Sequence, residues 1–270
     1  MEKQEVLTAL KAGLPVGDRD LYQFDFSGLD LSNVNLYQVR LIGVNFTQTN
    51  LTGADLQKAD LRRAELTQAI LRNANLESAW LYRTNLSGAD LSGANLTGAK
   101  LQVSRYDSQT IFPEGFAYKS SGAVGPGANL NGGYLNTANL RQIDLQGASL
   151  LGAYLGGTDL TQANLQGAKL SSADLRRAFL TGAFLRQARL NGANLAGVDL
   201  RGADLTGAEF ENLESIAGAD FSQVQGLSEE MRSQLLSYPL EQLDTWNSFT
   251  RRTTRQSLEN LMLKPTGDVF

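Results

Sequence analysis

The chain has 270 residues, 42% of them hydrophobic and 19% charged, and its 24 basic and 28 acidic side chains leave a net charge of −4. It has neither cysteine nor histidine, which excludes disulfides, thiolate nucleophiles, Ser-His-Asp triads and histidine zinc sites. The absence of both residue types leaves an enzyme only carboxylate, lysine or tyrosine chemistry. The mild acidity argues against nucleic-acid binding, which is normally accompanied by a basic surface.

The N-terminal residues 1–16 are predicted to form a helical cap. Val6, Leu7 and Leu10 recur at helical spacing within residues 2–12, so they share one apolar face. The segment has no basic stretch followed by an apolar core and therefore does not resemble a secretory signal. No apolar run approaches the roughly 20 residues that a membrane helix needs. We expect a cytoplasmic protein with no membrane association.

A five-residue repeat fills most of the chain. Every fifth residue from Leu21 to Leu101 is Leu or Phe, and the same holds from Leu130 to Phe210. We call this residue the centre of each repeat. The residue two positions before it is most often Ala, and Asp or Asn often lies between, as in Ala54-Asp55-Leu56. Alternation puts the centre and the Ala on one face, and the polar residues that follow are typical of turns. The pattern predicts short strands and turns wound into a coil with Leu and Ala inside.

This pattern resembles the pentapeptide-repeat family over residues 17–101 and 128–221. The resemblance implies an all-β solenoid, namely a right-handed quadrilateral parallel β-helix with four repeats per coil. Residue n then lies above residue n − 20. The resemblance is strongest to the pentapeptide proteins abundant in cyanobacteria, some of which regulate differentiation or transport. A fold of this kind does not by itself specify an activity.

The first repeat tract comprises residues 17–101, and an interrupting loop, residues 102–127, separates it from the second tract. The repeat phase is lost between Leu101 and Leu130, and Pro113 and Pro126 lie in the segment. Because a disordered linker would rarely hold so many aromatic residues, we expect a packed loop that projects from one corner and covers part of the coil surface. It is either a structural plug or a partner contact. The candidate contact residues are Tyr106, Phe112, Phe116 and Tyr118.

The second tract comprises residues 128–225 and a C-terminal helical cap or tail comprises residues 226–270. After Phe210 the register slips by one residue, and Ala219-Asp220-Phe221 is interpreted as one more repeat. Ser228, followed by two glutamates, predicts the start of a helix, and a second helix is expected near residues 254–263. Open ends of a repeat array expose unpaired backbone. The helices are therefore expected to cap one chain or to join two chains as a homodimer.

One wall of the first tract is unusual. Stacking at intervals of 20 brings together Tyr22, Arg40, Asp60, Arg62, Trp80 and Tyr82. Trp, Tyr and Arg are the residues enriched at protein-interface hot spots, so this wall is the candidate partner-binding face. The alternative is that Trp80 and Tyr82 pack beneath the loop of residues 102–127 or beneath a capping element. Stacked Asp and Asn residues form rows and do not converge on one point, as a calcium site requires, so we expect Asn ladders and no metal or cofactor.

These observations favour a non-catalytic protein–protein interaction scaffold or regulator that acts through its flat outer faces on an unidentified protein partner. The alternative is a DNA mimic that binds DNA gyrase or another topoisomerase, like the quinolone-protection proteins of the family. The resemblance implies a strongly acidic rod for that role, and this chain has no continuous acidic face. A glycosidase needs two carboxylates in a cleft, and a bore filled by Leu and Ala leaves no cleft.

Overall fold

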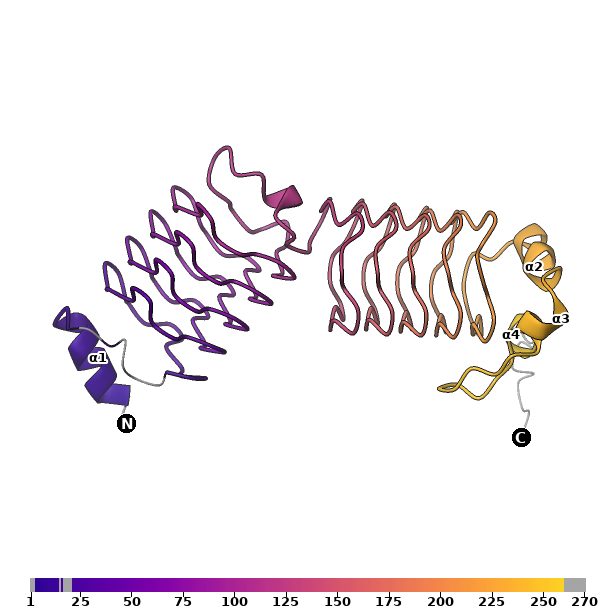
Figure 1. Ribbon diagram of the computed structural model, residues 1–270, viewed down its shortest axis with the longest axis horizontal. Coiled ribbons are helices and arrows are strands. Elements are labelled where there is room, and N and C mark those ends of the chain that lie inside the picture. The colour runs from indigo at the N-terminus through magenta and orange to yellow at the C-terminus, as the bar shows by residue number, and fades with distance from the viewer. Residues whose placement is uncertain (1–2, 15, 17–20, 260–270) are drawn as a thin grey trace, which may run out of the picture. The chain divides into compact units, whose positions relative to one another are not determined.

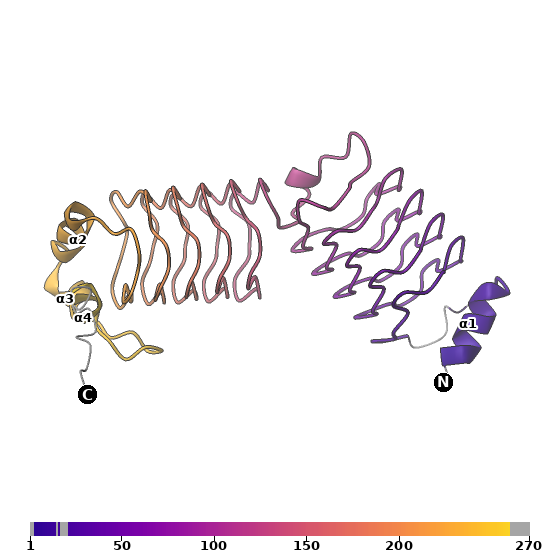
Figure 2. The ribbon, with the colours of Figure 1, turned by 180° about the vertical axis from the view of Figure 1, so that it is seen from behind.

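The computed structural model describes residues 3–14, 16 and 21–259. The chain divides into two compact units, Met1–Ala128 and Asn129–Phe270. Within each unit the chain winds through successive coils that lie side by side (Figures 1 and 2). In the described part, the helices are α1 (Lys3–Lys11), α2 (Glu229–Leu236), α3 (Leu240–Leu243), α4 (Thr254–Glu259) and the 3-10 turn η1 (Tyr118–Ser120). None of these described helices is long and apolar enough to cross a membrane.

Isolated parallel β-bridges join each coil to the next. They connect residues 20 apart, as in Arg40 to Asp60 and Asp60 to Trp80. Four repeats therefore make one coil, as the resemblance implied. The interval becomes 21 at Asp199 to Asp220, which confirms that Ala219-Asp220-Phe221 is one more repeat after a one-residue insertion.

In the repeat Leu56–Asp60, every backbone N–H has a hydrogen-bond partner. Leu56 and Lys58 donate to the next coil, at Asn75 and Glu77 (both 2.8 Å). Ala59 closes the turn onto the carbonyl of Leu56, and Asp60 donates to Val39 in the preceding coil (both 3.0 Å). The remaining N–H, of Gln57, donates to Oδ1 of Asp55 at 3.1 Å. Where Asp or Asn precedes the centre, its side chain can thus satisfy a donor that no carbonyl reaches.

The interior of the coils is filled by the repeat centres. All centres from Leu21 to Leu101 and from Leu130 to Phe210 are at most 5% exposed. Each such side chain contributes about 1.5–3 kcal/mol of apolar burial. Where Thr replaces the inner Ala, its hydroxyl donates to a carbonyl of the coil below, as from Thr84 to Leu61 (2.8 Å) and from Thr158 to Leu135 (2.7 Å). The Asn ladders predicted along the axis also form, for example from Asn45 to Asp25 (3.0 Å).

The interrupting segment begins inside the coil and then projects from it (Figure 1). Arg105 still pairs with Asn85, and Tyr106, 3% exposed, occupies a core position. Beyond it the loop packs on its own aromatic rings. Phe112 stacks on Tyr118 at 4.6 Å between ring centroids, and both rings meet Tyr106 edge-on. The segment is a packed loop, as its composition predicted.

The C-terminal segment lies over the last coil. Ser228 caps α2 by accepting the N–H of Met231 at 3.1 Å, as the sequence predicted. Gln242 Oε1 accepts the N–H of Ile216 at 2.9 Å, and Thr254 Oγ1 donates to the Ile216 carbonyl at 2.9 Å. The Phe221 N–H donates to Ser257 Oγ at 3.0 Å. These backbone groups have no further coil to pair with, so the segment satisfies them with side chains.

Two parts of this segment were not predicted from the sequence. They are α3 and a hairpin closed by an antiparallel bridge between Trp246 and Thr253. The helix predicted near residues 254–263 corresponds to α4 (Thr254–Glu259). The rest of the helix predicted over residues 254–263 lies outside the described residues, as does the start of the first tract at residues 17–20.

Candidate functional site

The wall predicted to bind a partner is assembled by the register of the first unit. Arg40, Asp60 and Trp80 lie on consecutive coils, joined by β-bridges. The turn residues beside them form a second row, in which the N–H of Arg63 donates to the carbonyl of Tyr82 at 3.0 Å. We call the set Tyr22, Arg40, Asp60, Arg62, Trp80 and Tyr82 the aromatic wall.

The centre of the aromatic wall is an ordered group of three side chains. Nε and Nη2 of Arg62 donate to the two carboxylate oxygens of Asp60 at 2.8 and 2.6 Å. The guanidinium carbon of Arg62 also lies 5.2 Å from the centroid of the Trp80 ring. Donation of these hydrogen bonds to the Asp60 carboxylate raises the pKa of Arg62 above its ordinary value. Bidentate pairing and cation–π contact both restrict the guanidinium, so a partner would meet a preformed surface.

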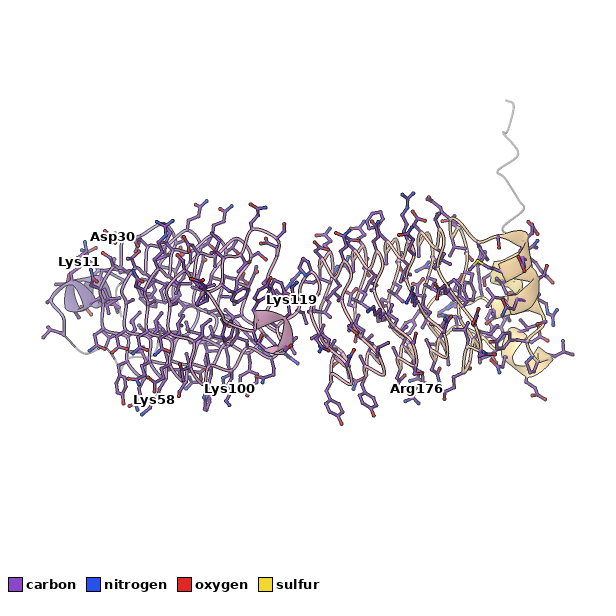
Figure 3. All side chains as sticks on the ribbon, turned by 90° about the horizontal axis from the view of Figure 1, so that it is seen from above. Lys11, Asp30, Lys58, Lys100, Lys119 and Arg176 are labelled. Atoms are coloured by element: carbon purple, nitrogen blue, oxygen red, sulfur yellow. The ribbon has the colours of Figure 1, made fainter. Side chains whose placement is uncertain are left out.

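The aromatic side chains of this wall are open to solvent. Trp80 is 48% exposed, Tyr22 51% and Tyr82 37%. The loop of residues 102–127 therefore does not bury Trp80 and Tyr82, and the alternative in which they pack beneath it is wrong. Arg40 is exposed as well. Figure 3 shows that Lys100, which follows Trp80 in the same row, points away from the coils.

The candidate residues of the loop are placed differently. Tyr106 is buried, and its hydroxyl donates to the Pro126 carbonyl at 2.9 Å. Phe112, Phe116 and Tyr118 are half-buried, and Phe112 contacts both of the others. The structure thus brings all four together in one cluster and leaves only part of three rings exposed. Tyr106 supports this cluster from the coil and is too buried to serve as a contact itself.

The second unit carries further exposed aromatic residues. Tyr134 and Tyr154 stack at 4.9 Å, with 79% and 43% exposure. Phe184 is 51% exposed, whereas Phe179 is in contact with Phe249 of the hairpin at 4.8 Å.

The arginines of the second unit are mostly ion-paired. Arg176 binds Asp174, Arg186 binds Asp204 and Arg201 binds Asp199, with N–O distances of 2.6–2.8 Å. These three arginines are neutralised by ion pairs on the solvated wall, and they therefore do not form a free basic patch.

No group of three or more Asp or Glu side chains in the described part of the chain could hold a metal ion. Sequence reasoning missed one polar feature, a pocket of about 420 Å³ where residues 250–257 meet the last coils. Its walls come from two segments that meet only when the tail folds back. No local pattern in the sequence could have indicated it.

A family model and several solved structures match this chain. The model of pentapeptide repeats matches in eight copies, at residues 30–68, 69–102, 138–177 and 168–207, which together exceed half of the chain. A search of the curated proteins found no match.

Among solved structures, HetL, a pentapeptide repeat protein involved in heterocyst differentiation regulation in the cyanobacterium Nostoc sp. strain PCC 7120, is 28% identical. The match covers 83% of this chain and 94% of HetL, with a TM-score of 0.28. The pentapeptide repeat protein alr5209 of Nostoc PCC 7120 is 31% identical over 45% of this chain and 93% of its own, with a TM-score of 0.30. The plasmid-mediated fluoroquinolone resistance protein QnrB1 is 18% identical over 78% and 97%, with a TM-score of 0.36.

Proposed function

Because this chain belongs to the pentapeptide-repeat family and buried Leu and Phe side chains fill its coils, we propose that it is a non-catalytic protein-interaction scaffold or regulator. The observation that carries the proposal is the exposed Trp80 beside the Asp60–Arg62 pair. The aromatic wall is its contact surface, and its partner is a protein.

The order of this surface supports the proposal. An exposed arginine normally loses side-chain freedom when it binds, and that loss weakens association. Arg62 is already held by Asp60 and Trp80, so less freedom remains to be lost. Exposed Trp and Arg also contribute more to interface affinity than most residue types. A protein surface with complementary acidic and apolar groups fits this wall.

No specific observation favours the alternative of a DNA mimic directed at gyrase or another topoisomerase. Such a role calls for rows of unpaired carboxylates. Here Asp60, Asp90 and Asp174 are each bound by an arginine at 2.6–2.7 Å. Binding to gyrase is therefore tested only as one outcome of affinity capture from native lysate.

The test is affinity capture from native lysate with three baits, followed by purified binding measurements on any partner found. The baits are wild type, the double variant Trp80→Ala/Tyr82→Ala, and the matched control Tyr134→Ala/Tyr154→Ala, which removes exposed aromatic residues from the second unit. We expect a protein retained by wild type and by the control, and bound at least about tenfold more weakly by the wall variant, as removal of a hot spot implies.

Equal binding by all three baits would show that the aromatic wall is not the contact surface. Loss only with the Tyr134/Tyr154 control would move the interface to the second unit. Capture of gyrase, with protection of its supercoiling from a fluoroquinolone, would replace the proposal by the DNA-mimic alternative.

We further propose that the coils are right-handed and that α1 and α2–α4 act as helical caps. The hydrogen bonds of Gln242, Thr254 and Ser257 to the last coil support the C-terminal cap. At the other end, the buried Val6 and Leu10 of α1 support an N-terminal one. The homodimer through the C-terminal helices stays a prediction, which light scattering of the full chain would check.

A further inference from the structure

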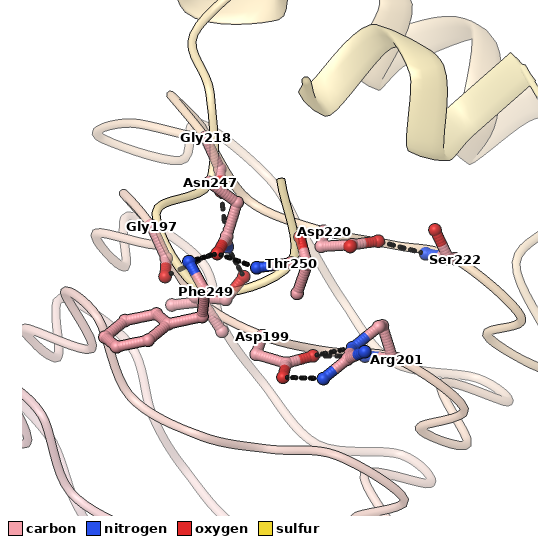
Figure 4. A network of polar contacts seen from close by, with 10 residues as sticks. Gly197, Asp199, Arg201, Gly218, Asp220, Ser222, Asn247, Phe249 and Thr250 are labelled. Atoms are coloured by element: carbon pink, nitrogen blue, oxygen red, sulfur yellow. Dashed lines mark hydrogen bonds and ion pairs between the residues drawn. The ribbon is translucent and has the colours of Figure 1, made fainter. Parts of the chain in front are cut away.

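A polar pocket of about 420 Å³ lies between the hairpin and the last two coils of the second unit. The residues that matter for its chemistry are Arg201, Asp220, Ser222, Thr250, Arg252 and Ser257. The hairpin is fixed at this place by Asn247, which is 1% exposed and whose Nδ2 donates to the carbonyl of Gly218 at 2.8 Å (Figure 4). Oδ1 of Asn247 accepts the N–H groups of Phe249 and Thr250. The pocket is thus a built feature of the tail.

Two buried polar atoms at this pocket have no hydrogen-bond partner among the described residues. Asp220 is fully buried, and its Oδ1 accepts the N–H of Ser222 at 2.8 Å. Its second oxygen, Oδ2, has no partner, and neither does Oγ1 of Thr250. A buried carboxylate oxygen without a donor is unfavourable, and native proteins rarely keep one unless a ligand, ion or water supplies the missing bond.

The charges around the pocket indicate what that ligand is. Arg201 is neutralised by Asp199, through contacts of 2.9 and 2.8 Å. Arg252 is exposed and its Nη1 lies 3.4 Å from Ser222 Oγ. It forms no ion pair with any described carboxylate. Arg201 also interacts electrostatically with Asp220, so Asp199 and Asp220 share its one positive charge. A net negative charge therefore remains at the buried end, and Arg252 lies at the rim without an ion pair.

We propose that this pocket binds a small zwitterion with the chemistry of a free α-amino acid. Its ammonium group donates to Asp220 Oδ2 and Thr250 Oγ1, and its carboxylate pairs with Arg252. A simple amine would leave Arg252 unpaired, and a simple anion would be repelled by Asp220. Because Asp220 is fully buried, the ammonium group reaches it only when side chains of the hairpin separate. Once bound, the ammonium group links Thr250 of the hairpin to Asp220 of the coil, so the hairpin should be more rigid in the bound state. This site is independent of the aromatic wall.

The test is calorimetric titration of the full chain with each of the common amino acids, with ethylamine and acetate as half-ligand probes. The variants are Asp220→Asn, which keeps the shape of the side chain and an acceptor for Ser222, and Arg252→Gln. Arg251→Gln, the adjacent exposed arginine, is the matched control. Thermal melting verifies that each variant is folded.

We expect at least one amino acid to bind wild type and Arg251→Gln saturably, with a dissociation constant of about 1 mM or lower, within the range of weak specific ligands. Asp220→Asn and Arg252→Gln should each weaken binding at least about tenfold, as loss of a charged hydrogen-bond partner implies. Amide hydrogen exchange at residues 247–253 should slow when the ligand is bound.

The proposal is overturned if no amino acid saturates wild type at about 10 mM, a result that would assign the two orphan atoms to a trapped water. It also fails if ethylamine binds as tightly as the amino acid, since the carboxylate would then have no role. Should Asp220→Asn melt early, Thr250→Val replaces it, and unchanged affinity in that variant contradicts the proposed contact.

Discussion

The second turn residue of each repeat has a left-handed backbone, and this conformation determines which residues fit there. Lys58 and Arg63 adopt φ of +57° and +59°. Many repeats use glycine at this position, such as Gly147 at +65°. A left-handed backbone costs a side-chain-bearing residue about 1–2 kcal/mol, so each glycine relieves strain that other repeats tolerate. The frequent Ser-Gly and Thr-Gly pairs of the sequence follow from this one torsion angle.

Alanine substitutions at two glycines, Gly147 and Gly226, would distinguish the effect of backbone strain from the effect of crowding. A Cβ on Gly147 would meet nothing within 4 Å, whereas a Cβ on Gly226, at φ +73°, would collide with the backbone and hydroxyl of Thr206. We expect Gly147→Ala to lower the free energy of unfolding by about 1 kcal/mol and Gly226→Ala by about 3 kcal/mol, because overpacking adds to the strain. Denaturant titration measures both. Equal losses would mean that crowding at Gly226 is negligible.

The C-terminal hairpin is an element with no stable interior of its own. Its bridge joins only Trp246 and Thr253, and an isolated hairpin is at best marginally stable in water. Asn247 compensates by bonding to coil carbonyls 29 to 50 residues earlier in the chain. Phe249 adds an edge-on contact with Phe179 at 4.8 Å. The hairpin is therefore ordered by the wall on which it lies.

Replacement of Asn247 by Ala should release this hairpin. The change removes the bonds to Gly197, Val198 and Gly218 and leaves the N–H of Phe249 and Thr250 without an acceptor. We expect the local opening free energy of residues 246–253 to fall by about 2 kcal/mol, seen as faster amide exchange. Ser248→Ala, at an exposed neighbour, is the control and should leave exchange unchanged. Equal protection in both variants would show that Phe249 alone holds the hairpin.

At the scale of the whole molecule, several aspartates on the coil walls have pKa values below the ordinary value. The hydrogen bond from Arg176 lowers the pKa of Asp174 below its ordinary value, against the opposing effect of burial. At Asp204, hydrogen bonds from Thr206 and Arg186 likewise outweigh burial and lower the pKa. A pKa that is lower in the folded chain stabilises the fold above the unfolded pKa, and this stabilisation is lost as pH falls through the folded pKa.

Thermal stability should therefore be nearly constant from about pH 8 to pH 5 and fall steadily below about pH 4, where unfolded aspartates begin to bind protons. The paired arginines are largely exposed, so solvent screening limits each carboxylate to about 1 kcal/mol or less. Melting temperatures measured between pH 2 and pH 8 check this expectation. In Arg176→Met the decline should be shallower, and an acid-independent melting temperature in wild type would contradict the argument.

The sequence by itself determined the coil. The five-residue period and the buried centres follow from contacts that repeat every 5 residues, so each appears as a regular pattern. The register of four repeats per coil, which places the Asn ladders, came from the resemblance to the pentapeptide-repeat family. The slip after Phe210 was visible for the same reason, since Asp220 keeps the local Ala-Asp-Phe unit and pairs with Asp199. The cap of α2 was equally local, because Ser228 bonds only three residues ahead.

Only the tertiary structure decided which side chains remain accessible and where the tail lies. Trp80 is 48% exposed, whereas the loop rings Phe112 and Tyr118 pack on each other and on Tyr106. The hairpin and its pocket depend on Asn247 and Thr250 reaching the last coils from tens of residues away. Contacts of this kind occur once and have no period, so they leave no pattern in the sequence, and only the folded chain brings their partners together.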